Sequence, residues 1–312
     1  MEKDVKWRDY FEDNCRYADI INGLGCGGAQ IVSSDDLTEL DTRKSSKSRD
    51  LIRKTALGMN FAIIGIENQD EIDYELPVRI MNYDALHYQK QLSNINKKVR
   101  ANPQGLEPGE YLYGFKKDSR LYPVVTFVLY AGEKPWTAAT SLHEIINFKD
   151  IPDTLRKMVA DYKTQVIDIR RLQDTTIFKT DVRYVFDFLR CCEDKDALLK
   201  LVSNEDYYQN VDKDAYEVIA KYANTKGIVN LETYKNPKGG INMCKGLRDL
   251  ITDSKAEGRA EGRAEERAEG LKALVHTYQK FNQTKEDAIN ALIDEYNVTK
   301  DEAIELVEKY WQ

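Results

Sequence analysis

The sequence is poor in the residues that build disulfide frameworks and imidazole metal sites. It contains five cysteines without a CxxC pair, and three scattered histidines. An odd number of cysteines with no CxxC pair argues against a disulfide framework and against a zinc site, so we expect reduced thiols. Any catalytic metal would therefore rest on carboxylates, the ligands that suit magnesium (Mg²⁺) or manganese (Mn²⁺).

Long apolar runs are also missing. No stretch approaches the ~20 residues of a membrane-spanning helix, and the opening MEKDVKWRDYFED has no apolar signal segment. We therefore expect a cytoplasmic protein with no membrane partner. The length of 312 residues, with 42% hydrophobic and 32% charged residues, fits a globular protein of about two domains.

An excess of positive charge is lacking as well. The formal net charge of −7 counts against a protein that simply coats nucleic acid. Basic residues nonetheless gather in two runs, one within residues 43–54 that includes Arg53, and one at Lys97, Lys98 and Arg100. Such runs are solvated surface in most proteins and contact phosphates in DNA-binding ones. Both interpretations are open at this point.

Apolar periodicity predicts an α/β core in residues 1–135. Residues 6–24 have helical spacing, and residues 76–99 form an amphipathic helical pattern with Pro77 in its first turn. Strands are expected at 29–41 (a short strand followed by a capped turn of helix), 48–56, 59–69 and 122–132. The last of these is a continuous apolar run, which is typical of a buried parallel strand.

The remainder of the chain is expected to be mainly helical. Residues 151–250 contain one predicted strand, at 164–172, among helices. Residues 255–270 repeat AEGR-like units every four residues, and their glycines cost about 1 kcal/mol each in a helix, so we expect a marginal solvated helix or a linker. Residues 271–312 contain TKEDAINALIDEY and TKDEAIELVEKYW, each opening with a threonine cap and an acid three residues later. This segment resembles a small helical module for self-association or partner binding.

A glycine cluster, NGLGCGG, formally satisfies G-x-G-x-x-G through Gly23, Gly25 and Gly28. A dinucleotide-binding fingerprint needs a strand before the glycines and a helix after them. Here the expected helix comes first and the strand-like QIV follows, so we interpret the glycines as a helix C-cap and a turn. A hydride-transfer enzyme is accordingly a distant alternative.

The strongest candidate for chemistry is an acidic pair near the ends of two expected strands. Asp50 lies near the start of the strand at 48–56, and Glu67 and Gln69 stand where the apolar run FAIIGI ends. If these strands are antiparallel neighbours, Asp50 and Glu67 lie near the same end of the sheet and can share a divalent cation. Gln69 would then orient a water molecule. The alternative is that Glu67 marks a strand end frayed into solvent.

Several stretches together resemble one known family. They are RYADIINGL, SRDLIRK, IIGIENQDEIDYELPVRIMNYDALHYQKQ, PVVTFVLYAGEKPW and the EGR-repeat tail. They are similar to the Rpn family, the recombination-promoting nucleases/putative transposases also called YhgA-like, within the PD-(D/E)xK superfamily. The resemblance covers nearly the whole chain, and IENQ followed by PVRIMNYDALHY is its most specific part. It implies a restriction-endonuclease-like αβββαβ core, a mixed sheet flanked by helices, that cleaves DNA with Mg²⁺ (or Mn²⁺).

The resemblance also assigns roles to residues. It implies that Asp50 and Glu67 are metal ligands and that Gln69 takes the position where lysine is usual, although an amide supplies no positive charge. An acidic residue of the first helix often completes such a metal site, and Asp19 is the candidate; an ordinary polar helix face is the other interpretation. Arg79 would contact a phosphate or form a structural salt bridge. Asp168, on the later strand, is interpreted as structural.

Two functions follow from this assignment. The first is a metal-dependent DNA endonuclease with Asp50, Glu67 and Gln69 at its centre, and with Arg53, Arg79, Lys97 and Lys98 on DNA phosphates. The alternative is an inactive nuclease fold that acts as a DNA-binding or oligomeric interaction protein, with the C-terminal helices making a homo-oligomer. The expected organisation is a nuclease-like core at 1–175, a helical region at 176–254, a linker helix at 255–270 and a helical module at 271–312.

Overall fold

The structure is a computed structural model that describes residues 2–39, 51–55, 60–66, 72–223, 234–237 and 239–311. It is a mixed α/β structure in which helices predominate. The chain divides into two compact units, Met1–Cys244 and Lys245–Gln312. In the described part of the chain, no helix is both long and apolar enough to cross a membrane.

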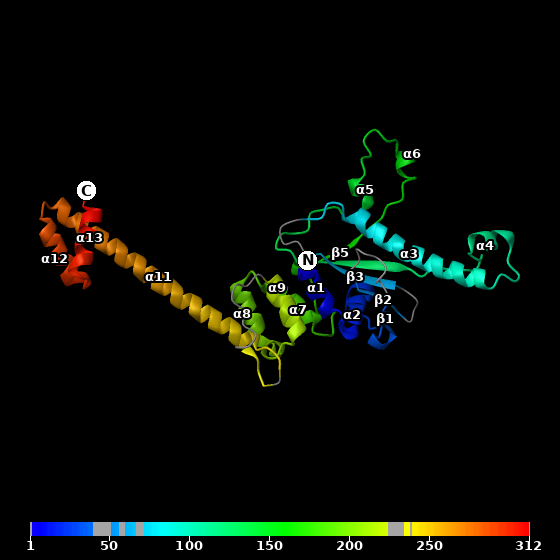
Figure 1. Cartoon of the computed structure of the whole chain (residues 1–312), viewed down its shortest axis with the longest axis horizontal. Helices are drawn as coiled ribbons and strands as arrows, with labels where there is room; N and C mark the ends of the chain where they lie inside the picture. The colour runs from blue at the N-terminus through cyan, green and yellow to red at the C-terminus, as the bar shows by residue number, and fades with distance from the viewer. Residues whose placement is uncertain are drawn as a thin grey trace. The chain divides into compact units, whose positions relative to one another are not determined.

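A five-stranded sheet organises the first unit, with the strands in the order β1-β2-β3-β4-β5 (Figure 1). The strands are β1 (Thr38–Glu39), β2 (Leu51–Lys54), β3 (Asn60–Ile66), β4 (Val124–Tyr130) and β5 (Gln165–Asp168). β1, β2 and β3 pair antiparallel, whereas β3, β4 and β5 are parallel. The sequence prediction of a buried parallel strand within 122–132 is therefore confirmed, since β4 has a parallel neighbour on each side.

Residues 29–41 differ from the prediction. They contain a 3₁₀ turn, η2 (Ser34–Asp36), followed by β1, which is the reverse of the expected order of strand and turn. The reason is the side chain of Asn22, whose Oδ1 accepts from the backbone N–H groups of Ile31 and Val32 and whose Nδ2 donates to the Val32 carbonyl. The backbone here therefore bonds to a buried amide instead of to a neighbouring strand.

The N-terminal helical segment is divided in two. It comprises α1 (Glu2–Tyr10) and α2 (Asn14–Ile20), and α2 continues into a π-helical turn, η1 (Ile21–Gly25). The break occurs where Asp13 caps α2 by accepting from the backbone N–H groups of Cys15 and Arg16. Gly27 and Gly28, with φ of 62° and 89°, reverse the chain after η1. The glycine cluster thus ends a helix, as the sequence predicts.

Helices cover both faces of the sheet. On one face, α3 (Leu76–Ala101) packs Leu76 and Ile80 against Val128 of β4. Phe127, next to Val128, points to the opposite face and lies close to Gly25 at the end of η1. The predicted helix at 76–99 is therefore confirmed, and it is amphipathic because only one of its sides meets the sheet.

Shorter helices follow α3 and the later strands in the first unit. They are α4 (Pro108–Tyr113), α5 (Leu142–Ile145), α6 (Asp153–Arg156), α7 (Val182–Cys191), α8 (Lys195–Asn204) and α9 (Lys213–Tyr222). The last three agree with the helical pattern expected after β5. Their buried residues include Val185, Phe186 and Val218, which give α7 and α9 apolar sides.

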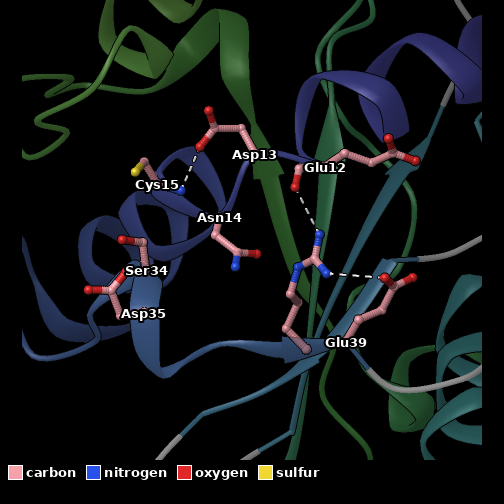
Figure 2. A pocket seen from close by; sticks show the side chains of 8 residues that line it. Glu12, Asp13, Asn14, Cys15, Ser34, Asp35 and Glu39 are labelled. Carbon is pink, nitrogen blue, oxygen red and sulfur yellow. Dashed lines mark hydrogen bonds and ion pairs between the residues drawn. The ribbon is translucent and has the colours of Figure 1, made fainter.

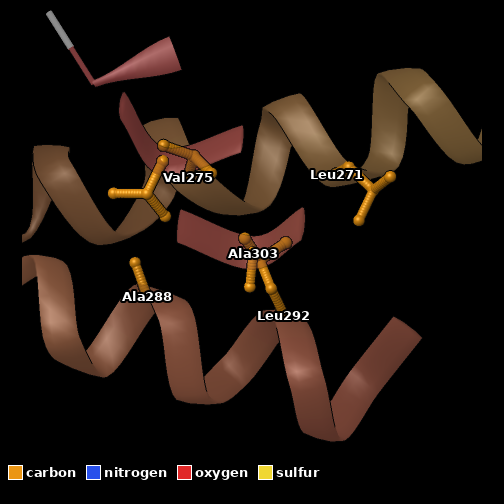
Figure 3. Packing of buried hydrophobic residues seen from close by; sticks show 6 residues of the cluster. Leu271, Val275, Ala288, Leu292 and Ala303 are labelled. Carbon is orange, nitrogen blue, oxygen red and sulfur yellow. The ribbon is translucent and has the colours of Figure 1, made fainter. Parts of the chain in front are cut away.

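The second unit contains most of α11 (Met243–Lys280), together with α12 (Lys285–Tyr296) and α13 (Lys300–Tyr310). Its core consists of small and aliphatic side chains from all three helices (Figure 3): Leu271, Val275, Ala288, Leu292, Ala303 and Val307. The AEGR-like repeat lies inside α11, and its residues 258–269 are solvent-exposed. Both predicted threonine caps are confirmed as complete capping boxes, Thr284 with Asp287 and Thr299 with Glu302.

Candidate functional site

The predicted catalytic residues stand next to β2 and β3 in the sequence, and the pairing of these strands tests one requirement of the prediction. Asp50, Glu67 and Gln69 themselves lie outside the described residues. The antiparallel pairing of β2 and β3 places Leu51 opposite Ile63, three residues before Ile66. The start of β2 and the end of β3 therefore lie at the same end of the sheet, as the prediction requires. The convergence of Asp50, Glu67 and Gln69 stays a prediction.

Three parallel strands end together at this edge of the sheet. Ile66 of β3 is in register with Tyr130 of β4, and Tyr130 is in register with Asp168 of β5. In α/β sheets, ligands bind outside the carboxyl ends of parallel strands. Adjacent strands are about 4.8 Å apart, so the last residues of β3, β4 and β5 lie side by side. We call this side of the sheet the carboxyl edge.

At the carboxyl edge, Arg171 connects the segment after β4 with the end of β5. Arg171 donates from Nη1 to both carboxylate oxygens of Asp168 at 3.2 Å, and from Nη2 to the Glu133 carbonyl. Asp168 also accepts from the backbone N–H of Trp136 at 3.3 Å. These contacts connect the segment after β4 with the end of β5, and they support the interpretation of Asp168 as structural.

Two buried groups reinforce the same edge. Arg170 donates from Nε to the Ala131 carbonyl at 2.8 Å and from Nη2 to the Tyr222 carbonyl at 2.7 Å. The Tyr130 hydroxyl donates to the Lys134 carbonyl at 2.8 Å. Burial raises the pKa of Tyr130, and the nearby Asp168 carboxylate raises this pKa further. Tyr130 is therefore a neutral hydrogen-bond donor at neutral pH, and its contacts are those of a structural group.

Asp19, the candidate third metal ligand, is a buried side chain on α2. It accepts from the backbone N–H of Lys179 (2.9 and 2.8 Å to its two oxygens), from the backbone N–H of Thr180 (2.7 Å) and from the Thr180 hydroxyl (2.7 Å). Asp19 thus anchors the segment before α7, and it does not lie on an ordinary polar helix face. Its role as a metal ligand stays a prediction.

The four predicted phosphate-binding residues occupy three different settings. Arg79 forms an ion pair with Asp73 at 2.6 Å. Arg53 is buried, donates to the Glu12 carbonyl at 3.0 Å and lies 3.7 Å from a Glu39 oxygen. Lys97 and Lys98 are solvent-exposed near the end of α3. The two arginines would have to break contacts within the protein to bind a phosphate, whereas the two exposed lysines could bind one directly.

Arg53 also borders an open surface pocket of about 680 Å³ (Figure 2). Its lining is mostly acidic or polar: Glu12, Asp13, Asn14, Cys15, Ser34, Asp35, Glu39 and Arg53. Asp13 is already the cap of α2, and Glu39 faces Arg53. The negative charge of this lining disfavours DNA phosphates, so the pocket is not a candidate DNA site.

The described residues contain no group of three His, Cys, Asp or Glu side chains that could hold a metal ion. Asp50 and Glu67 lie outside that search, and their role as Mg²⁺ ligands, which their carboxylate oxygens suit, stays a prediction. Sequence reasoning did not identify Lys134, Trp136 and Arg171 as neighbours of this edge. A signal was present, because the segments that contain them, YAGEKPW and IDIRR, come where two adjacent parallel strands end.

Comparison with known protein families matches the chain to a described family. The model of a family described as putative transposase, YhgA-like, matches residues 50–215, just over half of the chain. The matched range begins at Asp50 and includes β2 to β5, α3, α7 and the first residues of α9. No curated protein and no solved structure matches the chain.

Proposed function

The chain belongs to the YhgA-like putative transposase family, and from this premise we propose that it is a metal-dependent endonuclease that hydrolyses phosphodiester bonds in DNA. Family membership indicates a transposase- or nuclease-related role. The metal dependence, the substrate and the residues are the proposal's own content. They rest on the sheet and on the chemistry of Asp50, Glu67 and Gln69.

The observation that carries the proposal is the topology of the first unit. Helices α1 and α2 are followed by three antiparallel strands, then by α3, then by β4 parallel to β3. This is the αβββαβ order expected of a restriction-endonuclease-like core. The order supports the proposal because β2 and β3, the strands that border Asp50 and Glu67, are adjacent in the sheet.

The proposed chemistry divides between two carboxylates and one amide. Asp50 and Glu67 would hold Mg²⁺, which when bound lowers the pKa of water and stabilises charge on a phosphoryl oxygen. The amide of Gln69 would orient the attacking water by a hydrogen bond. It supplies no cation, so stabilisation of the scissile phosphate would fall to the metal and to basic side chains of the chain.

An inactive nuclease fold that binds DNA or assembles with other copies is the second candidate. Two features favour it: glutamine at position 69, where the superfamily usually has lysine, and the net charge of −7. The two candidates differ in one measurable property, since an inactive fold would bind DNA without breaking it.

The test is Mg²⁺-dependent nicking of supercoiled plasmid by the full-length protein. We expect Glu67→Ala and Asp50→Ala each to reduce the nicking rate by roughly 100-fold or more, because a preorganised charge-stabilising group is lost. Glu75→Ala, at the start of α3, is the matched control and should nick normally. Manganese binding, followed by the loss of its free-ion electron paramagnetic resonance signal, gives a readout independent of cleavage.

Gln69 variants separate the two candidates further. Gln69→Lys should keep or increase nicking, since it restores a cation beside the scissile phosphate, and Gln69→Ala should lower nicking while manganese binding persists. A wild-type protein that binds DNA and manganese but nicks no plasmid would support the inactive fold. Glu67→Ala that melts far below wild type in chelator, yet nicks normally, would make Glu67 a structural residue instead.

A further inference from the structure

The C-terminal part of α3 forms an arm that extends beyond the sheet. The Tyr88 hydroxyl accepts from the Val124 N–H at 3.1 Å, and the Gln91 amide bonds to both the N–H and the carbonyl of Tyr122 at 2.7 and 3.0 Å. Tyr122 precedes β4, so residues 92–101 run past the start of that strand (Figure 1). Ten helical residues extend about 15 Å. We call residues 92–120 the arm.

The arm contains a short helix, α4, that packs against α3. Gly114 caps α4 in the left-handed conformation, with φ of 65°. A Cβ atom there would lie 3.1 Å from the Asn96 Cβ, so a side chain would push α4 away from α3. Glu107 and Glu110 form a capping box, and Glu110 also accepts from the backbone N–H of Lys117 at 2.8 Å. These contacts give α4 a defined structure. We call α4 the tip of the arm.

This defined tip displays apolar side chains to solvent. Tyr111, Leu112 and Tyr113 are consecutive residues of α4 with 60%, 65% and 72% of their surface exposed. Three large apolar side chains gathered on one exposed turn indicate a binding surface more strongly than scattered single ones do. Residues two apart on a helix do not face each other, so the two tyrosine rings are available to separate groups of a ligand.

The charge around the tip identifies the kind of ligand. Six basic residues of the arm accompany the tyrosines: Lys97, Lys98, Arg100, Lys116, Lys117 and Arg120. The arm has three acids, of which Glu107 and Glu110 form the capping box. A region with net positive charge in a chain with a net charge of −7 suits a polyanion. Cations combined with exposed aromatic rings suit nucleic acid whose bases are accessible for stacking.

We propose that the arm binds single-stranded or otherwise unpaired DNA, with Tyr111 and Tyr113 stacking on bases and Lys97, Lys98 and neighbouring cations contacting phosphates. Base stacking requires an exposed base face, which a paired duplex does not offer at a surface tip. The choice of DNA over RNA rests on the proposed nuclease function. The binding surface itself is separate from the carboxyl edge, so it can be tested without cleavage.

The test is fluorescence anisotropy with a labelled single-stranded oligonucleotide and with a blunt duplex of the same length, both in chelator. We expect Tyr111→Ala combined with Tyr113→Ala to weaken single-strand binding about tenfold or more, because each substitution removes one stacking contact with a base. Duplex binding should change less than twofold. Tyr111→Phe with Tyr113→Phe should retain wild-type affinity, because phenylalanine keeps the stacking face.

A control and a charge variant complete the experiment. Phe281→Ala removes an equally exposed ring from the second unit and should bind like wild type. Lys97→Gln with Lys98→Gln should reduce the slope of log affinity against log salt by about 1.4, whereas the double tyrosine variant should leave it unchanged. All variants should show wild-type circular dichroism and melting.

Three outcomes would decide the matter. Wild-type affinity of the double alanine variant would overturn the proposal and leave the tip as a surface for a protein partner. Equal loss on the duplex and on the single strand would overturn the preference for unpaired DNA. Single-strand binding by the wild type, with tyrosine dependence, would support the proposal even if no plasmid were nicked, because chelator removes cleavage from the measurement.

Discussion

In the second unit, the side chains of Thr284 and Asp287 each accept a hydrogen bond from the other residue's backbone N–H. Thr299 and Glu302 do the same, and in each pair the partners are three residues apart. In the first unit, Asp19 bonds to Thr180 and the Arg16 guanidinium bonds to both Asp181 oxygens, at 2.9 and 2.8 Å. Those partners are more than 150 residues apart in the chain. The polar side chains of α12 and α13 thus bond to near neighbours, whereas these polar side chains of the first unit join segments that are far apart in the chain.

This difference has an energetic consequence. A local cap contributes about 1 kcal/mol, and its loss leaves the rest of a helix intact. A buried carboxylate with several donors is costlier to remove, since each donor is left without a partner in a region that water does not reach. We therefore expect the first unit to unfold cooperatively, and the second to respond to substitutions in small increments.

Removal of most of the second unit is expected to have the largest effect, because it tests the independence of the two units directly. A chain that ends at about residue 254 should keep the urea-unfolding midpoint of the first unit and should lose self-association entirely. Light scattering measures the second property. The same oligomeric state for the shortened and the full chain would rule out assembly through the C-terminal helices.

Asp19→Ala is expected to destabilise the first unit by about 3 kcal/mol in chelator, because the Lys179 N–H, the Thr180 N–H and the Thr180 hydroxyl all lose their acceptor. Urea denaturation monitored by tryptophan fluorescence measures it. Asp9→Ala, an exposed carboxylate on α1, is the matched control. Unchanged stability of Asp19→Ala in chelator, with loss of manganese binding, would instead make Asp19 a metal ligand.

Thr284→Ala and Thr299→Ala are each expected to lower the free energy of unfolding of the second unit by about 1 kcal/mol, the usual value of a lost N-cap. Thermal unfolding followed by circular dichroism measures the change. Thr277→Ala in the interior of α11 is the control, and it should be neutral or slightly stabilising because alanine is the better helix former. A cooperative collapse of the whole chain from one lost cap would contradict the contrast between the units.

The smallest effect is expected from Asp84, and it should appear only as pH changes. Burial raises the pKa of Asp84 above its ordinary value of 3.8, although Thr126 donates to it at 2.5 Å and the Tyr162 hydroxyl also donates. The folded state therefore holds this proton more tightly than the unfolded state. The resulting stability is present in acid and is lost as pH rises through the raised pKa.

Asp84→Asn removes this titration. The free energy of unfolding of the wild type, relative to the variant, should thus fall as pH rises from the ordinary pKa of 3.8 toward neutrality. Urea denaturation at several pH values measures it, with the exposed Asp118→Asn as the control. A wild-type advantage that grows with pH would mean that the carboxylate is stabilised in its charged form.

The sequence by itself determined the features that depend on near neighbours. Apolar periodicity identified α3 and β4, and the threonine–acid spacing identified both capping boxes, because these signals arise from contacts within a few residues. The sequence argument for Asp50 and Glu67 required the strands at 48–56 and 59–69 to be antiparallel neighbours, and the pairing of β2 and β3 meets that requirement.

Only the tertiary structure decided which polar side chains are free and which are occupied. The sequence allowed Arg79 either a phosphate contact or a salt bridge, and it pairs with Asp73. Arg53, a predicted phosphate contact, is buried and lies 3.7 Å from a Glu39 oxygen. Asn22 bonds to the backbone of Val32, where a strand was expected. The exposed Tyr111 lies on the arm because α3 extends past the start of β4, the strand that it covers. Arg53 faces Glu39 because the folded sheet places β1 beside β2, and a sequence pattern of near neighbours does not predict which strands pair.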